Sequence, residues 1–317
     1  MNQGSHAKER TASHARGGDD RPLAAIALVV FSLVLFTAMD AISKILVAEY
    51  SAIEVTWVRY LVNMVLLLPF ALRHPRAPLS TSQMGLQMTR GVVMVSSSVA
   101  FMSGLAYLPM ADATAIAFAT PLLVTAFSIP LLGERVGPRR WAAVAVGFLG
   151  VLLIVQPGTA AFHWAAIYPL LSSACFASGL IITRRLSMSE PPITTLLYTT
   201  GVACIAMTLF LPWVWQPMTL RALVMAGAMG VLSTVGQYLL VLGYQRGPAS
   251  LLAPFSYSQI IWSTIWGAFI FHNMPGTFTW AGAAVVIASG LYVFHRERVV
   301  VGARTASGAA ASEAPGQ

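Results

Sequence analysis

The sequence of residues 23–47 is LAAIALVVFSLVLFTAMDAISKILV. Only Asp40 and Lys44 are charged in this run, and it exceeds the roughly 20 residues that a helix needs to cross a bilayer. A cleaved signal peptide has a shorter apolar stretch and precedes a soluble domain, whereas further apolar runs follow this one. The stretch therefore predicts an uncleaved transmembrane helix.

Nine similar runs follow, separated by proline, glycine and charged residues. They are residues 55–72, 84–107, 110–132, 138–155, 164–183, 193–213, 222–244, 249–271 and 278–294. Connections of a few residues make neighbouring helices antiparallel. We therefore expect an all-α, polytopic membrane protein with ten transmembrane helices.

Composition excludes a soluble globular protein. Of the 317 residues, 57% are hydrophobic and 9% charged, against about 25% charged in typical soluble domains. The net charge of +8 comes from scattered basic residues with no basic stripe, so no nucleic-acid partner is expected. Cys175 and Cys204 lie far apart inside apolar runs and predict neither a disulfide framework nor a zinc site.

The basic residues predict the orientation. If the N-terminus is cytoplasmic, sixteen of the 19 Lys and Arg residues lie on the cytoplasmic side and Arg221 alone on the other. The remaining two, Lys44 and Arg59, lie inside helices. A bias of sixteen to one predicts a multi-pass protein of the cytoplasmic (inner) membrane with both termini in the cytoplasm.

The sequence also contains an internal repeat. Ala-Ala-Ile opens the first span at residues 24–26 and the sixth at 165–167, and Phe118 and Phe255 occupy matching positions. Because each copy holds five helices, the second copy enters the membrane from the opposite side, which is the arrangement of many alternating-access carriers. The expected units are a disordered tail at 1–22, five-helix repeats at 23–156 and 163–295, and a disordered tail at 296–317.

Several short motifs occur in a characteristic order. They are Asp40-Ala-Ile-Ser-Lys44, Glu54-Val-Thr-Trp-Val-Arg59, Leu108-Pro109-Met-Ala-Asp112, Ala119-Thr-Pro121 and Leu132-Gly133-Glu134-Arg135. Together they resemble the EamA family of the drug/metabolite transporter superfamily, which implies a ten-helix carrier over most of the chain. The pattern from Asp40 to Arg59 is similar to that of S-adenosylmethionine uptake carriers, and less distinctively to amino-acid and vitamin carriers. The second repeat departs from the family, since Phe271-His272-Asn273 replaces a Gly-Glu corner.

Asp40, Lys44 and Arg59 are the first candidate site residues. An ionised side chain at a helix centre costs about 2.5–3.5 kcal/mol on insertion scales, so these residues should face the bundle interior. Four residues apart, Asp40 and Lys44 share a helix face and can pair. The group predicts either a substrate or proton site, or a buried pair that holds the first two helices together.

Aromatic and amide side chains supply the other candidates. In the ninth span Gln259, Trp262 and Trp266 lie near one face, which suits a ring-bearing or cationic ligand. Gln237 in the eighth span lies deep enough to need a hydrogen-bond partner. Phe118 in the fourth span precedes Pro121, which should free a backbone carbonyl and kink the helix.

The sequence lacks the residues that an enzyme active site would need, because all six histidines lie in tails or at helix ends. No cofactor or metal is expected. The sequence predicts a carrier for a small polar metabolite such as an amino acid, S-adenosylmethionine or a vitamin, with the bilayer as its second partner and a proton or ion as candidate coupling partner. Uptake of riboflavin or another flat-ring vitamin remains an alternative, as does a non-transporting membrane receptor or assembly protein. The oligomeric state is left open.

Overall fold

A computed structural model describes residues 20–72, 81–132, 138–159, 162–186, 189–246 and 252–312, and throughout these ranges the regular structure is helical. The first-repeat helices are α2 (Asp20–Leu46), α3 (Ala52–Leu72), α4 (Met84–Tyr107), α5 (Met110–Ala117), α6 (Thr120–Leu132) and α7 (Pro138–Val155). The second repeat comprises η1 (Trp164–Ala166), α8 (Ile167–Leu186), α9 (Pro192–Val214), α10 (Leu220–Arg246), η2 (Ala253–Tyr257), α12 (Ser258–Phe271) and α13 (Thr277–Ser312).

The predicted all-α fold is confirmed, and each of the ten expected spans is helical. Seven helical segments are long and apolar enough to cross a membrane, and one of them, 110–128, contains α5 and the start of α6. Two shorter apolar helices cover 141–155 and 277–293. The remaining expected span consists of η2 followed by α12.

The fourth span is broken between α5 and α6, where the sequence predicted a kink. Pro121 has no N–H to donate to the carbonyl of Ala117. That carbonyl instead accepts hydrogen bonds from Thr120 Oγ1 at 2.8 Å and from Ser173 Oγ of α8 at 3.2 Å. The ninth span is broken at the matching place, between η2 and α12. Discontinuous helices at equivalent points of two repeats are typical of carriers, and they lie at the substrate site in several folds.

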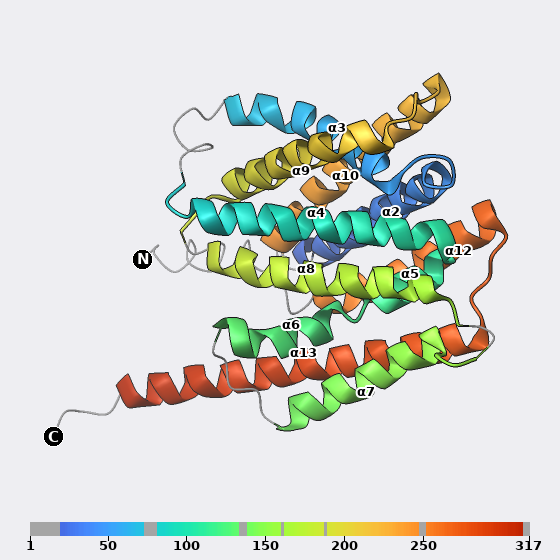
Figure 1. The fold of residues 1–317 in the computed structure, drawn as a ribbon. Helices are drawn as coiled ribbons and strands as arrows, with labels where there is room; N and C mark the ends of the chain where they lie inside the picture. The colour runs from blue at the N-terminus through green and yellow to red at the C-terminus, as the bar shows by residue number, and fades with distance from the viewer. Residues whose placement is uncertain are drawn as a thin grey trace, which may run out of the picture.

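The two repeats interlock in the bundle (Figure 1). α10 packs against α2, α4 against α8, and α3 against α9, so each pair joins helices from different repeats. The last helices of the repeats, α7 and α13, lie together at one edge of the bundle. Their backbones approach closely at Gly150 and Gly282, since a Cβ added to Gly282 would lie 2.5 Å from the Gly150 carbonyl oxygen.

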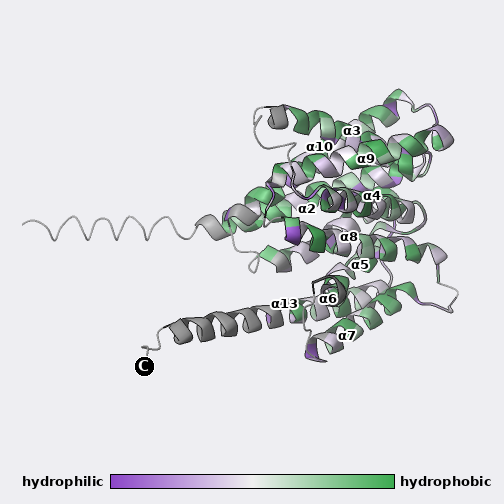
Figure 2. Ribbon diagram, turned by 60° about the vertical axis from the view of Figure 1, so that its left-hand side comes forward, coloured by the Kyte–Doolittle hydropathy of each residue, from purple (hydrophilic) through white to green (hydrophobic). Residues whose placement is uncertain are grey.

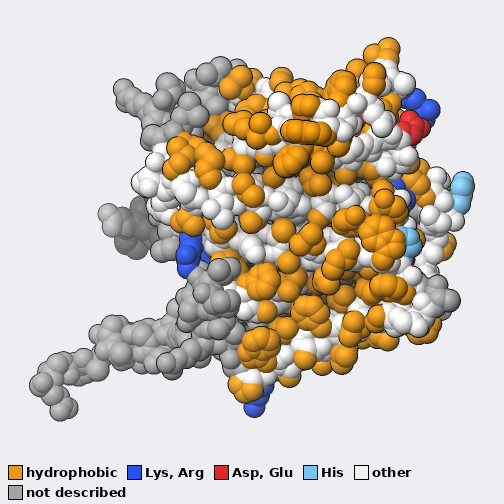
Figure 3. Space-filling view, viewed as in Figure 1, with side chains coloured by type: hydrophobic (Ala, Val, Ile, Leu, Met, Phe, Trp, Pro, Cys, Tyr) orange, Lys and Arg blue, Asp and Glu red, His pale blue; other side chains and the backbone are white. Residues whose placement is uncertain are grey.

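The outer surface of the bundle is apolar. Hydrophobic residues cover most of the helices in Figure 2, and in Figure 3 the charged side chains of the visible face gather toward its two ends. Five of the exposed side chains are 59–80% exposed, namely Leu149, Ile205, Leu209, Trp213 and Phe269. This distribution fits a lipid environment around the middle of the bundle.

Two details of the expected organisation differ in the structure. α2 already begins at Asp20, and residues 1–19 of the predicted N-terminal tail lie outside the described residues. Residues 296–312, predicted to be disordered, continue α13 as helix to Ser312. The alanines of this segment have high helix propensity, which explains why the helix extends beyond the apolar span.

Candidate functional site

Asp40 of α2 and Arg59 of α3 lie in the interior of the bundle. Asp40 is 6% exposed and Arg59 8% exposed. The charge of Arg59 acts on the Asp40 carboxyl, yet the two side chains form no ion pair, and Asp40 makes no hydrogen bond within the described part of the chain. Buried charges are normally paired or hydrogen-bonded because desolvating them is costly. The two groups are therefore buried without the direct pairing that is usual for buried charges.

The Arg59 guanidinium has weak partners only. Nη1 lies 3.9 Å from the sulfur of Met39, the group lies 4.9 Å from the ring centroid of Tyr60, and Nε is buried without a partner. An arginine presents five N–H donors in a planar fork that matches a carboxylate. Most of these donors remain available to a ligand.

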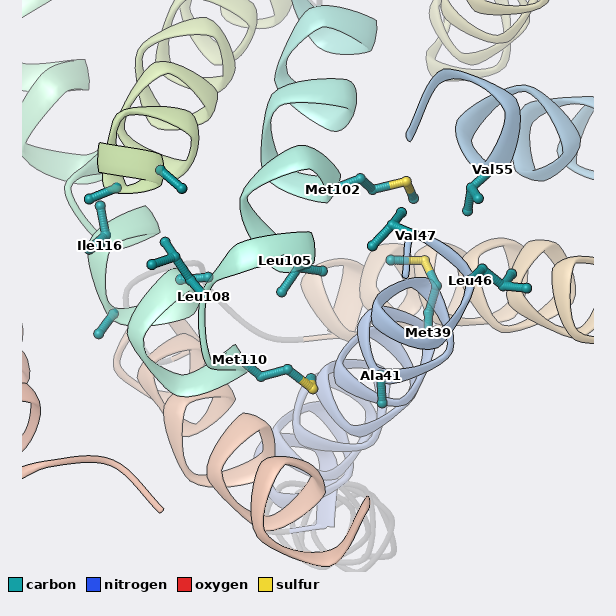
Figure 4. Packing of buried hydrophobic residues seen from close by; sticks show 14 of the residues in the cluster. Met39, Ala41, Leu46, Val47, Val55, Met102, Leu105, Leu108, Met110 and Ile116 are labelled. Carbon is teal, nitrogen blue, oxygen red and sulfur yellow. The ribbon is translucent and has the colours of Figure 1, made fainter. Parts of the chain in front are cut away.

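Figure 4 shows part of an apolar cluster that includes Met39, whose sulfur contacts Arg59. Met39 of α2, Val55 of α3 and Met102 of α4 belong to this cluster. Thr56 donates a hydrogen bond to the Met102 sulfur at 3.0 Å, and Ser43 donates one to the Met229 sulfur at 3.0 Å. Apolar surroundings of this kind strengthen the electrostatic interactions of Asp40 and Arg59 with any bound charge.

Lys44 does not pair with Asp40, so the predicted Asp40–Lys44 contact is wrong. Its ammonium donates to the carbonyl oxygens of Leu105 at 2.6 Å and Leu108 at 2.5 Å. Pro109 lacks the N–H that would continue the α4 ladder to Leu105. Lys44 therefore completes the hydrogen bonding at the junction of α4 and α5, which gives it a structural role. It also lies 5.5 Å from the ring centroid of Phe271, on α12.

α12 contributes a row of buried polar atoms that lack protein partners. These atoms are Ser258 Oγ, Trp262 Nε1, Thr264 Oγ1 and Trp266 Nε1. Trp266 packs against the apolar cluster that contains Met39, while Trp262 packs against Val29 and Leu33 of α2. Gln259 is half-buried on the same helix. A buried unsatisfied donor costs about 1–3 kcal/mol, so a row of them favours a bound molecule that accepts their hydrogen bonds.

Phe118 and Gln237 have different placements. Phe118, the residue that ends α5, lies 5.0 Å from Tyr257 between ring centroids and so connects the breaks of the two discontinuous spans. Gln237 is exposed, and the structure does not bring it to Asp40 or α12. α10 is apolar nearly all round, which is why periodicity did not identify its inward face.

The sequence reasoning missed several buried polar residues, among them Arg90, Glu54 and Asn63. Arg90, expected at the cytoplasmic surface, is 8% exposed inside α4, where its guanidinium contacts α8 and α9. Glu54 is fully buried in the first turn of α3, although Asp40 was expected to be the one deeply placed acid. The side-chain amide of Asn63 on α3 lies against α10, where it contacts Thr234 Oγ1 at 2.9 Å and Ser233 Oγ at 3.4 Å. Their positions several residues inside apolar runs were the available signal for Arg90 and Asn63.

Among the described residues, no group of His, Cys, Asp or Glu side chains could hold a metal ion. Cys175 and Cys204 are both free and half-buried.

Two copies of one family model match the chain, over residues 23–156 and 163–294, and its description is the EamA-like transporter family. The chain belongs to the EamA-like transporter family. The matched ranges coincide with the two five-helix repeats, so the protein is a membrane transporter of the drug/metabolite transporter type and not an enzyme.

Named relatives are similar over most of their length. An S-adenosylmethionine uptake transporter from Rickettsia bellii is 27% identical over 269 residues, covering 85% of this chain and 92% of the relative. A riboflavin transporter from Rhizobium johnstonii is 31% identical over 237 residues, covering 73% and 76%. The pseudopaline exporter CntI from Pseudomonas aeruginosa is 28% identical, covering 83% and 93%. These relatives include both uptake and export proteins.

One solved crystal structure superimposes with a TM-score of 0.55 at 20% identity, and the match covers 84% of this chain and 94% of the other. At this identity the likeness concerns the fold alone.

Proposed function

We propose that this EamA-family transporter is an alternating-access carrier for a small polar metabolite that bears an amine, together with a carboxylate or a flat ring. The site comprises Asp40 of α2 and Arg59 of α3 together with α12 of the second repeat, which packs against α2. The observation that carries the proposal is the pair of buried, unpaired charges, because a structural role would leave them paired. Asp40 binds the cationic group, Arg59 an anionic or hydrogen-bond-accepting group, and Trp262 and Trp266 donate from α12.

The proposal includes the orientation. The protein lies in the cytoplasmic membrane with both termini in the cytoplasm, as the sixteen-to-one distribution of basic residues supports. Cysteines introduced at Ser5 and Ser312, in a background with Cys175 and Cys204 replaced by alanine, should react with an impermeant thiol reagent only after the cells are opened. Reaction at either position in intact cells would contradict this orientation.

A transport assay tests the carrier. The purified protein in proteoliposomes is offered labelled S-adenosylmethionine, the common amino acids and riboflavin, and the assay is repeated with Asp40→Asn. We expect saturable movement of at least one amine-bearing compound, and strong loss in the variant. Absence of movement for every compound, with binding retained, would favour the non-transporting receptor.

Riboflavin is a second candidate substrate, because the riboflavin transporter of Rhizobium johnstonii is 31% identical and the α12 indoles offer a flat apolar surface. Riboflavin carries no amine cation for Asp40. Riboflavin transport that survives Asp40→Asn, with no movement of amine-bearing compounds, would favour this candidate over the first.

A further inference from the structure

A second buried arginine, Arg90, lies near the start of α4. Arg90 is 8% exposed. Its Nε donates to Thr183 Oγ1 of α8 at 2.7 Å, and its Nη1 donates to the Thr195 carbonyl of α9 at 3.3 Å and to Thr199 Oγ1. The residue therefore lies where the first repeat contacts the second.

All of these acceptors are neutral. Thr183 and Thr199 donate their own hydroxyl protons to the carbonyls of Gly179 and Thr195, and so they face Arg90 as acceptors. Arg90 forms no ion pair with a described residue, and its Nη2 donates to none of them. A charge held by neutral acceptors alone retains much of its desolvation cost, and an anion would offset that cost.

Tyr60 links Arg59 to the helix that carries Arg90. Its ring is 4.9 Å from the Arg59 guanidinium, and its hydroxyl is 3.1 Å from Ser98 Oγ of α4. Arg59 and Arg90 both belong to the first repeat, and neither forms an ion pair with a described carboxylate.

We propose that Arg90 is a second anion-binding group, which binds the carboxylate of the substrate in the half of the bundle opposite Arg59. This inference rests on the proposed carrier function and adds that the substrate carries a carboxylate. A substrate moving through the bundle would exchange its carboxylate between the two guanidinium groups, and Thr183 and Thr199 hold Arg90 in position for this contact.

Matched ligand pairs test the inference by thermal unfolding of the purified protein. Each pair differs in the carboxylate alone: S-adenosylmethionine with its decarboxylated form, and amino acids with their amides. We expect the wild type to bind the acid member more tightly, and Arg90→Gln to weaken acid binding by about 10- to 100-fold while leaving the other member unchanged. Arg90→Lys should retain part of the preference, and Arg139→Gln, at the exposed start of α7, should behave as wild type.

A purely structural Arg90 gives a different result. Its replacement would lower the unfolding temperature without ligand, as Thr183→Val with Thr199→Val would, and the preference for the acid member would not change. That result overturns the proposal, as does a wild type that none of the carboxylates stabilises. If Arg90→Gln does not fold, Arg90→Lys decides between the two roles. A reduced preference for the acid member at normal stability supports binding by Arg90, and an unchanged preference overturns it.

The phosphate of an anionic lipid could satisfy the same guanidinium. The unfolding series is therefore repeated with phosphatidylglycerol in place of the carboxylates. Arg90-dependent stabilisation by phosphatidylglycerol alone overturns the substrate assignment. The carrier function and the Arg90 site can fail separately. Carboxylate binding that depends on Arg90, without transport, supports the Arg90 site and contradicts the carrier function. Transport of riboflavin alone supports the carrier function and contradicts the Arg90 site.

Discussion

The two repeats have the same succession of helices, but they contribute different chemistry to the bundle. In the first repeat, Asp40, Arg59 and Arg90 lie more than one turn inside their helices, and Lys44, Glu54 and Asp112 lie in terminal turns. In the second repeat, every Asp, Glu, Lys and Arg from 163 to 294 lies at a helix end or in a connection, namely Arg184, Arg185, Glu190, Arg221 and Arg246. The second repeat instead supplies the unsatisfied indole and hydroxyl atoms of α12. A duplicated fold can therefore assign charge recognition to one copy and neutral hydrogen bonding to the other.

The strongest test of this division removes a charge from the first repeat. Asp40→Asn should reduce transport of an amine-bearing substrate by about 10- to 100-fold, because a charged contact contributes about 1.5–3 kcal/mol. Stability should change little, since Asp40 has no hydrogen bond to lose. Uptake into proteoliposomes and the unfolding temperature measure the two quantities, with Glu49→Gln, an exposed acid beyond α2, as control.

The second test separates a structural charge from a binding charge. Lys44→Leu leaves the carbonyls of Leu105 and Leu108 without their ammonium donor, which should lower the free energy of unfolding by about 1–3 kcal/mol. Lys44→Arg should restore most of the loss. Thermal unfolding measures the effect. Unchanged stability combined with weakened substrate affinity would instead make Lys44 a ligand-binding residue and contradict its capping role.

The third test addresses the second repeat. Trp262→Phe and Trp266→Phe keep the aromatic surface and remove the indole N–H, so each should weaken substrate binding by up to about tenfold. Stability should be unchanged or slightly higher, because the lost donor has no partner in the protein. Ligand-dependent unfolding measures both, and Trp164→Phe, 54% exposed at the start of the second repeat, is the control. Normal affinity in both variants would limit α12 to packing.

The same contrast explains what the sequence could predict. Helix positions follow from long apolar runs between charged and proline residues, so all ten spans were expected, and Pro121 indicated the break in the fourth. Lys44 was assigned the wrong partner. The four-residue spacing within α2 identifies Asp40 as a neighbour on the same helix face, but it cannot identify the carbonyls at the α4–α5 junction. Arg90 was counted with surface charges because its acceptors come from α8 and α9, whose packing on α4 no local pattern encodes.

Gln237 gives the smallest expected effect and the sharpest test of sequence against structure. The sequence predicted it as a site residue because an amide deep in a span needs a partner, but the structure exposes it on α10, beside Tyr238, which is 61% exposed. Gln237→Leu should therefore change substrate affinity by less than about twofold and stability by about 0.5 kcal/mol at most, as surface changes generally do. Asn63→Leu on α3 is the matched comparison, since it removes a buried amide that contacts Ser233 and should destabilise the protein by about 1–3 kcal/mol. If Gln237→Leu abolished transport while the protein remained folded, this face of α10 would belong to the substrate route, and the second repeat would contribute a polar group beyond those of α12.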